Sequence, residues 1–146
     1  MTRLIDVEAR TDGSLIIGTY SETLDHLWLG TGSPVRVSSS VSDAELGDVL
    51  VRALRESRHG IERPERLDQL MKPKLKVAGV RSQRAYYEGT RSIAVSEEDD
   101  GTIQVEPSRR RQREFLPLRD RFFTLHGASS EELAKAVREG LERSEG

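Results

Sequence analysis

The feature that most constrains the fold is a pair of Asp-Gly turns, each placed between two segments of alternating apolar residues. The first, Asp12-Gly13, lies in the middle of residues 3–20. The second, Asp100-Gly101, ends the loop that separates residues 92–96 from residues 102–106. An Asp-Gly pair supplies the positive φ angles that tight β-hairpins require, and alternation places apolar side chains on one face of a sheet. The two turns therefore predict two antiparallel hairpins.

Two helices are marked by serine capping motifs. Ser42 begins the first, with a glutamate three residues later, and this helix is expected to run to about Arg58 with Gly60 as its left-handed C-terminal residue. Ser129 begins the second helix with the same spacing. Apolar residues follow each serine at helical spacing and form one stripe per helix: Leu46, Val49, Leu50, Ala53 and Leu54 in the first, and Leu133, Ala136, Val137 and Leu141 in the second.

Shorter elements are expected in the rest of the chain. Short strands are predicted at 27–29, 35–37 and 122–125, short helices at 64–71, 74–79 and 82–88, a turn at 30–34 and an irregular basic segment at 108–121. Pro107 is expected to end the second hairpin, since proline cannot donate to a strand ladder. Together these elements predict an α+β fold, with an antiparallel sheet built from hairpins, two long amphipathic helices packed on it and short connecting helices. The length of 146 residues suits a single domain over residues 1–146.

The composition excludes several functional classes. The chain has no cysteine, which rules out disulfides, thiolate catalysis and cysteine-ligated zinc. No apolar run approaches the roughly 18 residues of a membrane span, and acidic residues stand near the N-terminus where a signal peptide would be apolar. We therefore expect a cytoplasmic protein without a membrane anchor. The net charge of -2 argues against a domain built mainly to coat nucleic acid.

Four consecutive acids on the second hairpin are the first candidate for a partner interface. Glu97, Glu98, Asp99 and Asp100 form the loop before Gly101. Such a loop is either a solvated connection or a contact surface for a basic partner, where charge speeds encounter and fixes specificity. A calcium site is disfavoured because the alternating oxygen ligands of an EF-hand loop are absent.

A run of arginines is the second candidate. Arg109, Arg110, Arg111 and Arg113 occupy four of five positions. Guanidinium groups bind carboxylates of a protein partner or phosphates of a nucleic acid, and a solvated loop is the third interpretation. Nucleic-acid binding usually includes interleaved aromatic residues for stacking, and only Phe115 lies nearby.

The sequence contains no recognisable catalytic or metal-binding arrangement. The three histidines, His26, His59 and His126, stand in unrelated contexts without metal-ligand spacing. His59 is expected near the C-terminal end of the first long helix, where a cation interacts favourably with the helix dipole. We therefore predict no enzyme activity, no cofactor and no metal, although an active site with a histidine assembled in space stays open as an alternative.

Several stretches together resemble the CdiI family of contact-dependent growth inhibition immunity proteins. They are Tyr20-Ser21-x-Thr23-Leu24-x-x-Leu27-Trp28, Asp43-x-Glu45-Leu46-Gly47, Ala53-Leu54-x-x-Ser57-Arg58, Ala78-Gly79-Val80-x-Ser82-x-x-Ala85-Tyr86, Gly89-x-x-Ser92-Ile93-x-Val95, Pro107-Ser108 and the final Ser129-x-Glu131-Glu132-Leu133. The resemblance spans roughly residues 15–143 and its motifs are largely structural.

The resemblance implies a small cytosolic inhibitor that binds the C-terminal domain of a toxin, often a nuclease, and blocks it without chemistry. In some such pairs a toxin β-hairpin adds to the sheet of the immunity protein, which needs an open strand edge. No binding residues are carried over from the motif positions, so the acidic loop and the arginine run are the predicted interface. The alternative function is a nucleic-acid-binding accessory domain that uses Arg109–Arg113. Inhibitors of nucleases are often strongly acidic, and a net charge of -2 with an arginine run departs from that pattern.

Overall fold

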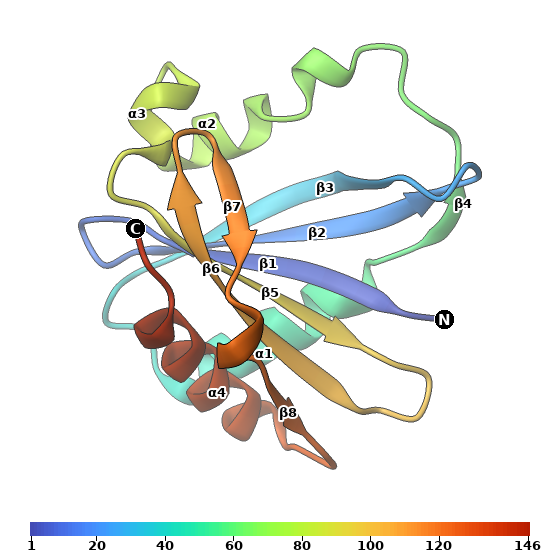
Figure 1. The fold of residues 1–146 in the computed structure, drawn as a ribbon, viewed down its shortest axis with the longest axis vertical. Coiled ribbons are helices and arrows are strands. Elements are labelled where there is room, and N and C mark those ends of the chain that lie inside the picture. The colour runs from blue at the N-terminus through green and yellow to red at the C-terminus, as the bar shows by residue number, and fades with distance from the viewer.

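A computed structural model describes all residues from 1 to 146 and contains eight strands, four α-helices and two 3₁₀ turns (Figure 1). The strands are β1 (Arg3–Ala9), β2 (Leu15–Thr23), β3 (Trp28–Val37), β4 (His59–Ile61), β5 (Arg91–Glu97), β6 (Ile103–Arg111), β7 (Glu114–Pro117) and β8 (Phe123–Leu125). The helices are α1 (Asp43–Arg55), α2 (Lys72–Ala78), α3 (Gln83–Tyr87) and α4 (Ser130–Arg143), and the 3₁₀ turns are η1 (Leu67–Gln69) and η2 (Arg119–Arg121). The predicted α+β class is confirmed. None of the helices combines the length and the apolar character that a membrane span requires.

All eight strands belong to one sheet in the order β3-β2-β1-β5-β6-β7, with β4 beside the end of β2 and β8 beside the start of β6. All pairings are antiparallel except that of β4 with β2. Both predicted hairpins are confirmed: β1 pairs with β2 around Gly13, and β5 pairs with β6 around Gly101. The glycines of both turns have positive φ angles, 84° and 85°.

Alternation along the central strands separates the two faces of the sheet. In β1, Ile5 and Val7 enter a core of 17 buried apolar residues, whereas Asp6 and Glu8 lie on the opposite face. Figure 1 shows α1 and α4 on one side of the sheet, and α2 and α3 on the other. The core therefore lies between the sheet and the pair α1 and α4, and the second face, here called the open face, is covered only in part by α2 and α3.

Both serine caps form as predicted, but α1 ends earlier than expected. Ser42 accepts a hydrogen bond from the backbone of Glu45, and Ser129 forms a complete capping box with Glu132. The prediction that the first helix reaches about Arg58 is wrong, since α1 ends at Arg55 and the chain then enters strand β4. His59 and Gly60 are therefore strand residues and neither ends a helix.

The expected turn at residues 30–34 is a bulge inside a continuous strand. β3 runs from Trp28 to Val37, and its register against β2 shifts between the pairs Thr19↔Thr31 and Ile17↔Val35. Three residues of β3 thus lie opposite the single Gly18. Because β3 is an edge strand, Gly32 and Pro34 are accommodated there without the loss of a central ladder.

The interpretation of Pro107 as the end of the second hairpin is wrong. β6 continues through it to Arg111, and Pro107 pairs with Ile93. The carbonyl of Pro107 accepts from the backbone of Leu118 (2.9 Å), so its nitrogen faces the outer edge of β6. That edge is paired by β8 only as far as Val105 and by β7 only from Ser108, and no N–H is needed at the break between them.

The segment 108–121, expected to be irregular, forms the rest of β6, a tight turn, β7 and η2. The turn consists of Gln112 and Arg113, because Arg111 pairs with Glu114. Gln112 adopts a φ of 57°, which glycine, asparagine or aspartate usually provides in such turns. A turn without these residues gives no local signal, which explains why this hairpin was missed.

Of the three short helices, the last is confirmed by the cap of Ser82 on Ala85. The second begins at Lys72, earlier than expected, and ends at Ala78, with Gly79 as its left-handed C-terminal cap, so the predicted end is confirmed to within one residue. The helix predicted at 64–71 is reduced to the 3₁₀ turn Leu67–Gln69.

Candidate functional site

The four predicted acids form the tip of the β5–β6 hairpin, here called the acidic tip (Glu97, Glu98, Asp99 and Asp100). Glu97 lies 3.9 Å from Arg3, and Glu98 accepts a hydrogen bond of 2.8 Å from the hydroxyl of Thr2. Asp99 contacts the amino group of Met1, and Asp100 accepts from the backbone of Thr102 (2.9 Å). Hydrogen bonds from Thr102 lower the pKa of the Asp100 carboxyl. Each acid of the tip therefore already has a partner within the chain.

The acidic tip borders a hollow of about 740 Å³ that is mixed in charge. Arg3, Arg58 and His59 line it together with three of the four acids. Positive groups next to the carboxylates reduce the negative potential that a basic partner would meet. The negative potential at the acidic tip is therefore weaker than four consecutive acids in the sequence suggest.

The predicted arginines lie on the β6–β7 hairpin and border a second hollow, here called the arginine hollow (Arg84, Tyr87, Glu88, Arg110, Arg111, Gln112, Arg113 and Glu114). Its volume is about 960 Å³. Of the four predicted arginines only Arg109 is outside this lining, because it turns to the C-terminal Glu145 (3.3 Å). The hollow also contains Arg84 from α3, a residue that the sequence did not mark because it is distant in the chain from the arginine run.

Aromatic side chains pack α3 against β7, the two elements on either side of the arginine hollow. Tyr87 of α3 lies 5.5 Å from Phe115 of β7 and 5.6 Å from Tyr86, measured between ring centroids. Arg110 donates from Nη1 to the carbonyl of Gln112 (3.1 Å), while its Nε is buried without an acceptor. The two elements that carry these arginines, α3 and the β6–β7 hairpin, are therefore packed against each other.

The structure does not bring the two predicted clusters together. They lie at opposite ends of β6, a strand of nine residues, and Figure 1 shows the two hairpin tips pointing away from each other. At about 3.3 Å per residue they are separated by roughly 25–30 Å. They are therefore two surfaces and not one interface patch.

A buried ion cluster on the open face was missed by the sequence interpretation. It consists of Lys74 from α2, Asp6 and Glu8 from β1, and the hydroxyl groups of Tyr20 and Tyr86. The ammonium of Lys74 lies 2.6 Å from a carboxylate oxygen of each acid. Tyr20 donates to Asp6 (2.9 Å) and Tyr86 donates to Glu8 (2.7 Å). The cluster connects α2 to the sheet.

Burial and mutual charge shift the pKa values within the ion cluster. Burial raises the pKa of Asp6 to about 6, against the opposing charge of Lys74. Burial lowers the pKa of Lys74, but the two carboxylates raise it by more, so this pKa lies above its ordinary value. The second oxygen of Asp6, Oδ1, has no hydrogen-bond partner. A Cβ atom on Gly18 would lie 2.6 Å from that oxygen, so only glycine leaves room for the cluster.

Next to the ion cluster, the open face has a pocket of about 320 Å³. Leu4, Tyr20, Phe115 and Phe122 contribute to its walls, together with Asp6 and Glu106. Burial raises the pKa of Glu106, against the charge of Arg119. Seven of the thirteen residues that line the pocket are apolar, so it is suited to an apolar side chain.

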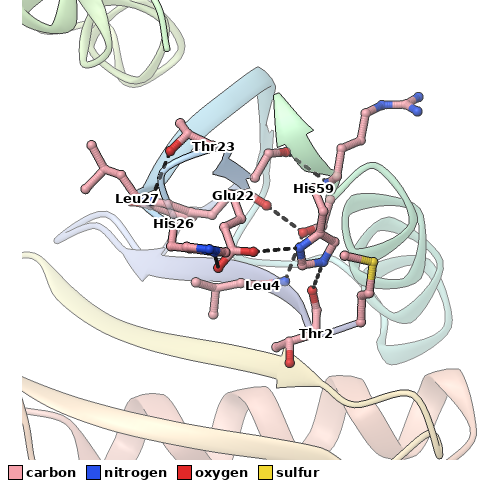
Figure 2. Close-up of polar contacts among 12 residues, drawn as sticks. Thr2, Leu4, Glu22, Thr23, His26, Leu27 and His59 are labelled. Atoms are coloured by element: carbon pink, nitrogen blue, oxygen red, sulfur yellow. Dashed lines mark hydrogen bonds and ion pairs between the residues drawn. The ribbon is translucent and has the colours of Figure 1, made fainter. Parts of the chain in front are cut away.

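Two of the three histidines converge on one carboxylate (Figure 2). Nδ1 of His59 lies 3.2 Å and Nδ1 of His26 lies 3.6 Å from oxygens of Glu22. The other ring nitrogen of His59 contacts the carbonyl of Thr2, and its ring packs edge-on against Trp28. Both nitrogens of His59 thus face oxygen atoms of the chain, which fixes the ring between β4, β2 and the N-terminus. No group of three His, Asp or Glu residues is arranged to hold a metal.

Comparison with known proteins gives one family and several solved structures, including one from Neisseria meningitidis and one from Yersinia pseudotuberculosis. The model of the family described as CdiI, CDI immunity protein, matches residues 9–144. A protein of unknown function from Neisseria meningitidis aligns over 99% of this chain and 96% of its own, with a TM-score of 0.83 and 17% identity. A chain of the CdiA-CT/CdiI toxin and immunity complex from Yersinia pseudotuberculosis aligns over 99% and 98%, with a TM-score of 0.82 and 20% identity. At 17% and 20% identity, the two structural matches show the fold alone. The search of curated proteins found no match.

Proposed function

We propose that this chain, which belongs to the CdiI family of CDI immunity proteins, is an immunity protein that binds and neutralises a cognate toxin domain. The observation that carries the proposal is the family match over residues 9–144, which includes almost every element of the fold. The toxin is the C-terminal domain of a CdiA-type effector of contact-dependent growth inhibition. A similar fold in a toxin and immunity complex supports this partner.

Neutralisation by this chain is stoichiometric and involves no catalysis. His59 is held by Glu22 and Thr2 and has no free ring nitrogen for proton transfer. An inhibitor that must silence every toxin molecule works by tight binding, with a Kd in the nanomolar range or below, which corresponds to about −12 kcal/mol. The site of action is the cytoplasm, and the whole chain acts as one domain.

The toxin-binding surface includes the charged hairpin tips at the two ends of β6. Both the acidic tip and the β6–β7 hairpin extend from the sheet, and β7 is also an edge strand with four residues. An edge strand offers unpaired backbone groups to an incoming strand of a partner. A nuclease toxin with a basic active site would face the acidic tip, and an acidic patch of the toxin would face the arginines.

The test is direct binding to the toxin domain encoded immediately upstream. We expect co-purification in a 1:1 complex, a nanomolar Kd by calorimetry and protection of cells that express the toxin domain. Absence of both binding and protection would contradict the proposed function. A gel-shift assay with RNA at low salt tests the alternative of a nucleic-acid-binding domain, which predicts binding that falls steeply as salt increases.

A further inference from the structure

We infer that the arginine hollow is a carboxylate-binding surface that receives an acidic segment of the toxin domain, an inference that rests on the proposed function. The first observation is that its guanidinium groups are unpaired. Arg84, Arg110, Arg111 and Arg113 all line the hollow, yet none has a carboxylate oxygen within 4.0 Å. Four positive side chains face one volume, and the two glutamates of the lining, Glu88 and Glu114, offset only part of their charge.

Other arginines of the chain also lack an ion pair, Arg52 among them, but the arginine hollow gathers four such arginines in one lining. Arg109 on the same hairpin is paired with Glu145, as is Arg121 of η2 (2.9 Å). Glu88 and Glu114 border the hollow but form no ion pair with its arginines. Arg110 has in addition a buried Nε without an acceptor, so the free protein leaves part of the hydrogen-bonding capacity of this guanidinium unused.

Carboxylates fit this surface better than nucleic acid does. Single-stranded nucleic acid is held by phosphate contacts together with bases stacked on free aromatic faces. The only aromatic residue of the lining, Tyr87, already packs against Tyr86 and Phe115. Glu88 and Glu114 repel any anion, and a nucleic acid with one charge per nucleotide would place several phosphates near them. Two or three separate carboxylates can instead approach the guanidinium groups alone and bind in bidentate fashion.

The backbone positions around the hollow are fixed by short elements. Arg111 and Arg113 flank Gln112, the residue with a φ of 57° in a two-residue turn, and this short turn sets the spacing of their backbone positions. Arg84 approaches from a different element, α3. A partner therefore needs at least two acidic side chains with a spacing that matches these positions, which makes the surface suited to discriminate between toxins.

The experiment compares two double variants of the full chain in binding to the toxin domain encoded immediately upstream. The test variant is Arg111→Glu with Arg113→Glu. The matched control is Arg52→Glu with Lys135→Glu, which reverses the same charge at exposed positions of α1 and α4 that form no ion pair. We expect the Kd of the test variant to rise by about a hundredfold or more, mainly through a slower association at low salt, and that of the control to change less than about threefold.

Further measurements separate the possible failures. Circular dichroism must give both variants the melting curve of the native chain, and the neutral variant Arg111→Gln with Arg113→Gln serves as replacement if the reversal unfolds the hairpin. Acid-to-lysine changes in the toxin domain should restore binding to the test variant. If the native chain binds the toxin domain and the folded test and neutral variants bind it equally well, only the carboxylate-binding inference is overturned. If the native chain itself does not bind, the proposed function fails as well.

Discussion

The two faces of the sheet are built with opposite chemistry, although the same strands supply both. Ile5 and Val7 of β1 are fully buried in the apolar core beneath α1 and α4. Asp6 and Glu8, their neighbours in the same strand, are almost as deeply buried on the open face, where Lys74 binds both. The helices reflect this difference, since α2 has no fully buried residue.

The comparison shows that burial on the two faces depends on different interactions. The face beneath α1 and α4 is here called the helix face. Its stability follows from apolar area removed from water, and it tolerates a change of side-chain shape better than the introduction of a charge. On the open face, the carboxylates are tolerable only while Lys74 compensates them, because an unpaired buried charge costs several kcal/mol. The open face is therefore the more sensitive to removal of a single group.

Removal of Lys74 should have the largest effect. Lys74→Met leaves Asp6 and Glu8 buried next to each other without a cation, and we expect the free energy of unfolding at pH 7 to fall by about 3–5 kcal/mol. The loss should shrink in acid, where the carboxyl groups are protonated. Urea denaturation with Lys72→Met as the control, an exposed lysine of the same helix, measures it. A loss of similar size in both variants would mean that the cluster is not the cause.

On the helix face, the corresponding change is Leu50→Ala in α1. Leu50 is 0% exposed within the core, so the variant leaves a cavity and should lose about 3–4 kcal/mol. This loss should be independent of pH, because no titratable group is involved. Urea denaturation at pH 4 and pH 7 tests this difference from Lys74→Met. A pH-dependent loss for Leu50→Ala would contradict the separation of the two faces.

The helix face was predictable from sequence because its signals are local. The hairpin of residues 3–20 followed from alternation around Asp12-Gly13, and both capped helices followed from a serine and a glutamate three residues apart. Periodicity also selected the inward residues: Leu46, Leu50 and Leu54 are all in the core. These features depend on neighbours within a few positions, which a sequence displays directly.

The open face and the candidate surfaces were less predictable because they depend on contacts between distant residues. Lys74 lies 68 positions from Asp6, and no pattern in a single sequence connects them. Arg84 joins the arginine hollow in the same way, from a separate helix. The β6–β7 hairpin was missed for a different reason, since Gln112 adopts a turn conformation that glycine usually provides. The charges of the acidic tip and of the arginine run are visible in the sequence, but their pairing within the chain is not.

Ionisation of Asp6 should give the open face a pH dependence of its own. The pKa of Asp6 is about 6 in the folded protein and 3.8 as its ordinary value. Because the folded pKa is raised, the contribution of Asp6 to stability is complete below about pH 3.8 and is lost as the pH rises through 6. Relative to Asp6→Asn, the native chain should lose up to about 3 kcal/mol between these pH values.

Urea denaturation at half-unit steps from pH 2 to pH 7 measures this difference. The control is Asp12→Asn, where the sign is reversed. Hydrogen bonds from Ser14 lower the pKa of Asp12, so its contribution is present above the ordinary value of 3.8 and is lost as the pH falls through the folded pKa. Equal pH profiles for the native chain and Asp6→Asn would show that burial does not govern Asp6.

The smallest effect is expected at the turn of the β6–β7 hairpin, which belongs to the open face and depends on packing more than on turn chemistry. At the φ of 57° of Gln112, a residue other than glycine costs about 1–2 kcal/mol. Glycine relieves this cost but adds about 0.4–1 kcal/mol of conformational freedom to the unfolded chain. Gln112→Gly should therefore raise the free energy of unfolding by about 0.5 kcal/mol, a gain that calorimetry can detect as a higher Tm. Binding to the toxin domain should be nearly unchanged, since Arg111 and Arg113 keep their positions. A loss of stability would show instead that the side chain of Gln112 contributes to the packing of the open face.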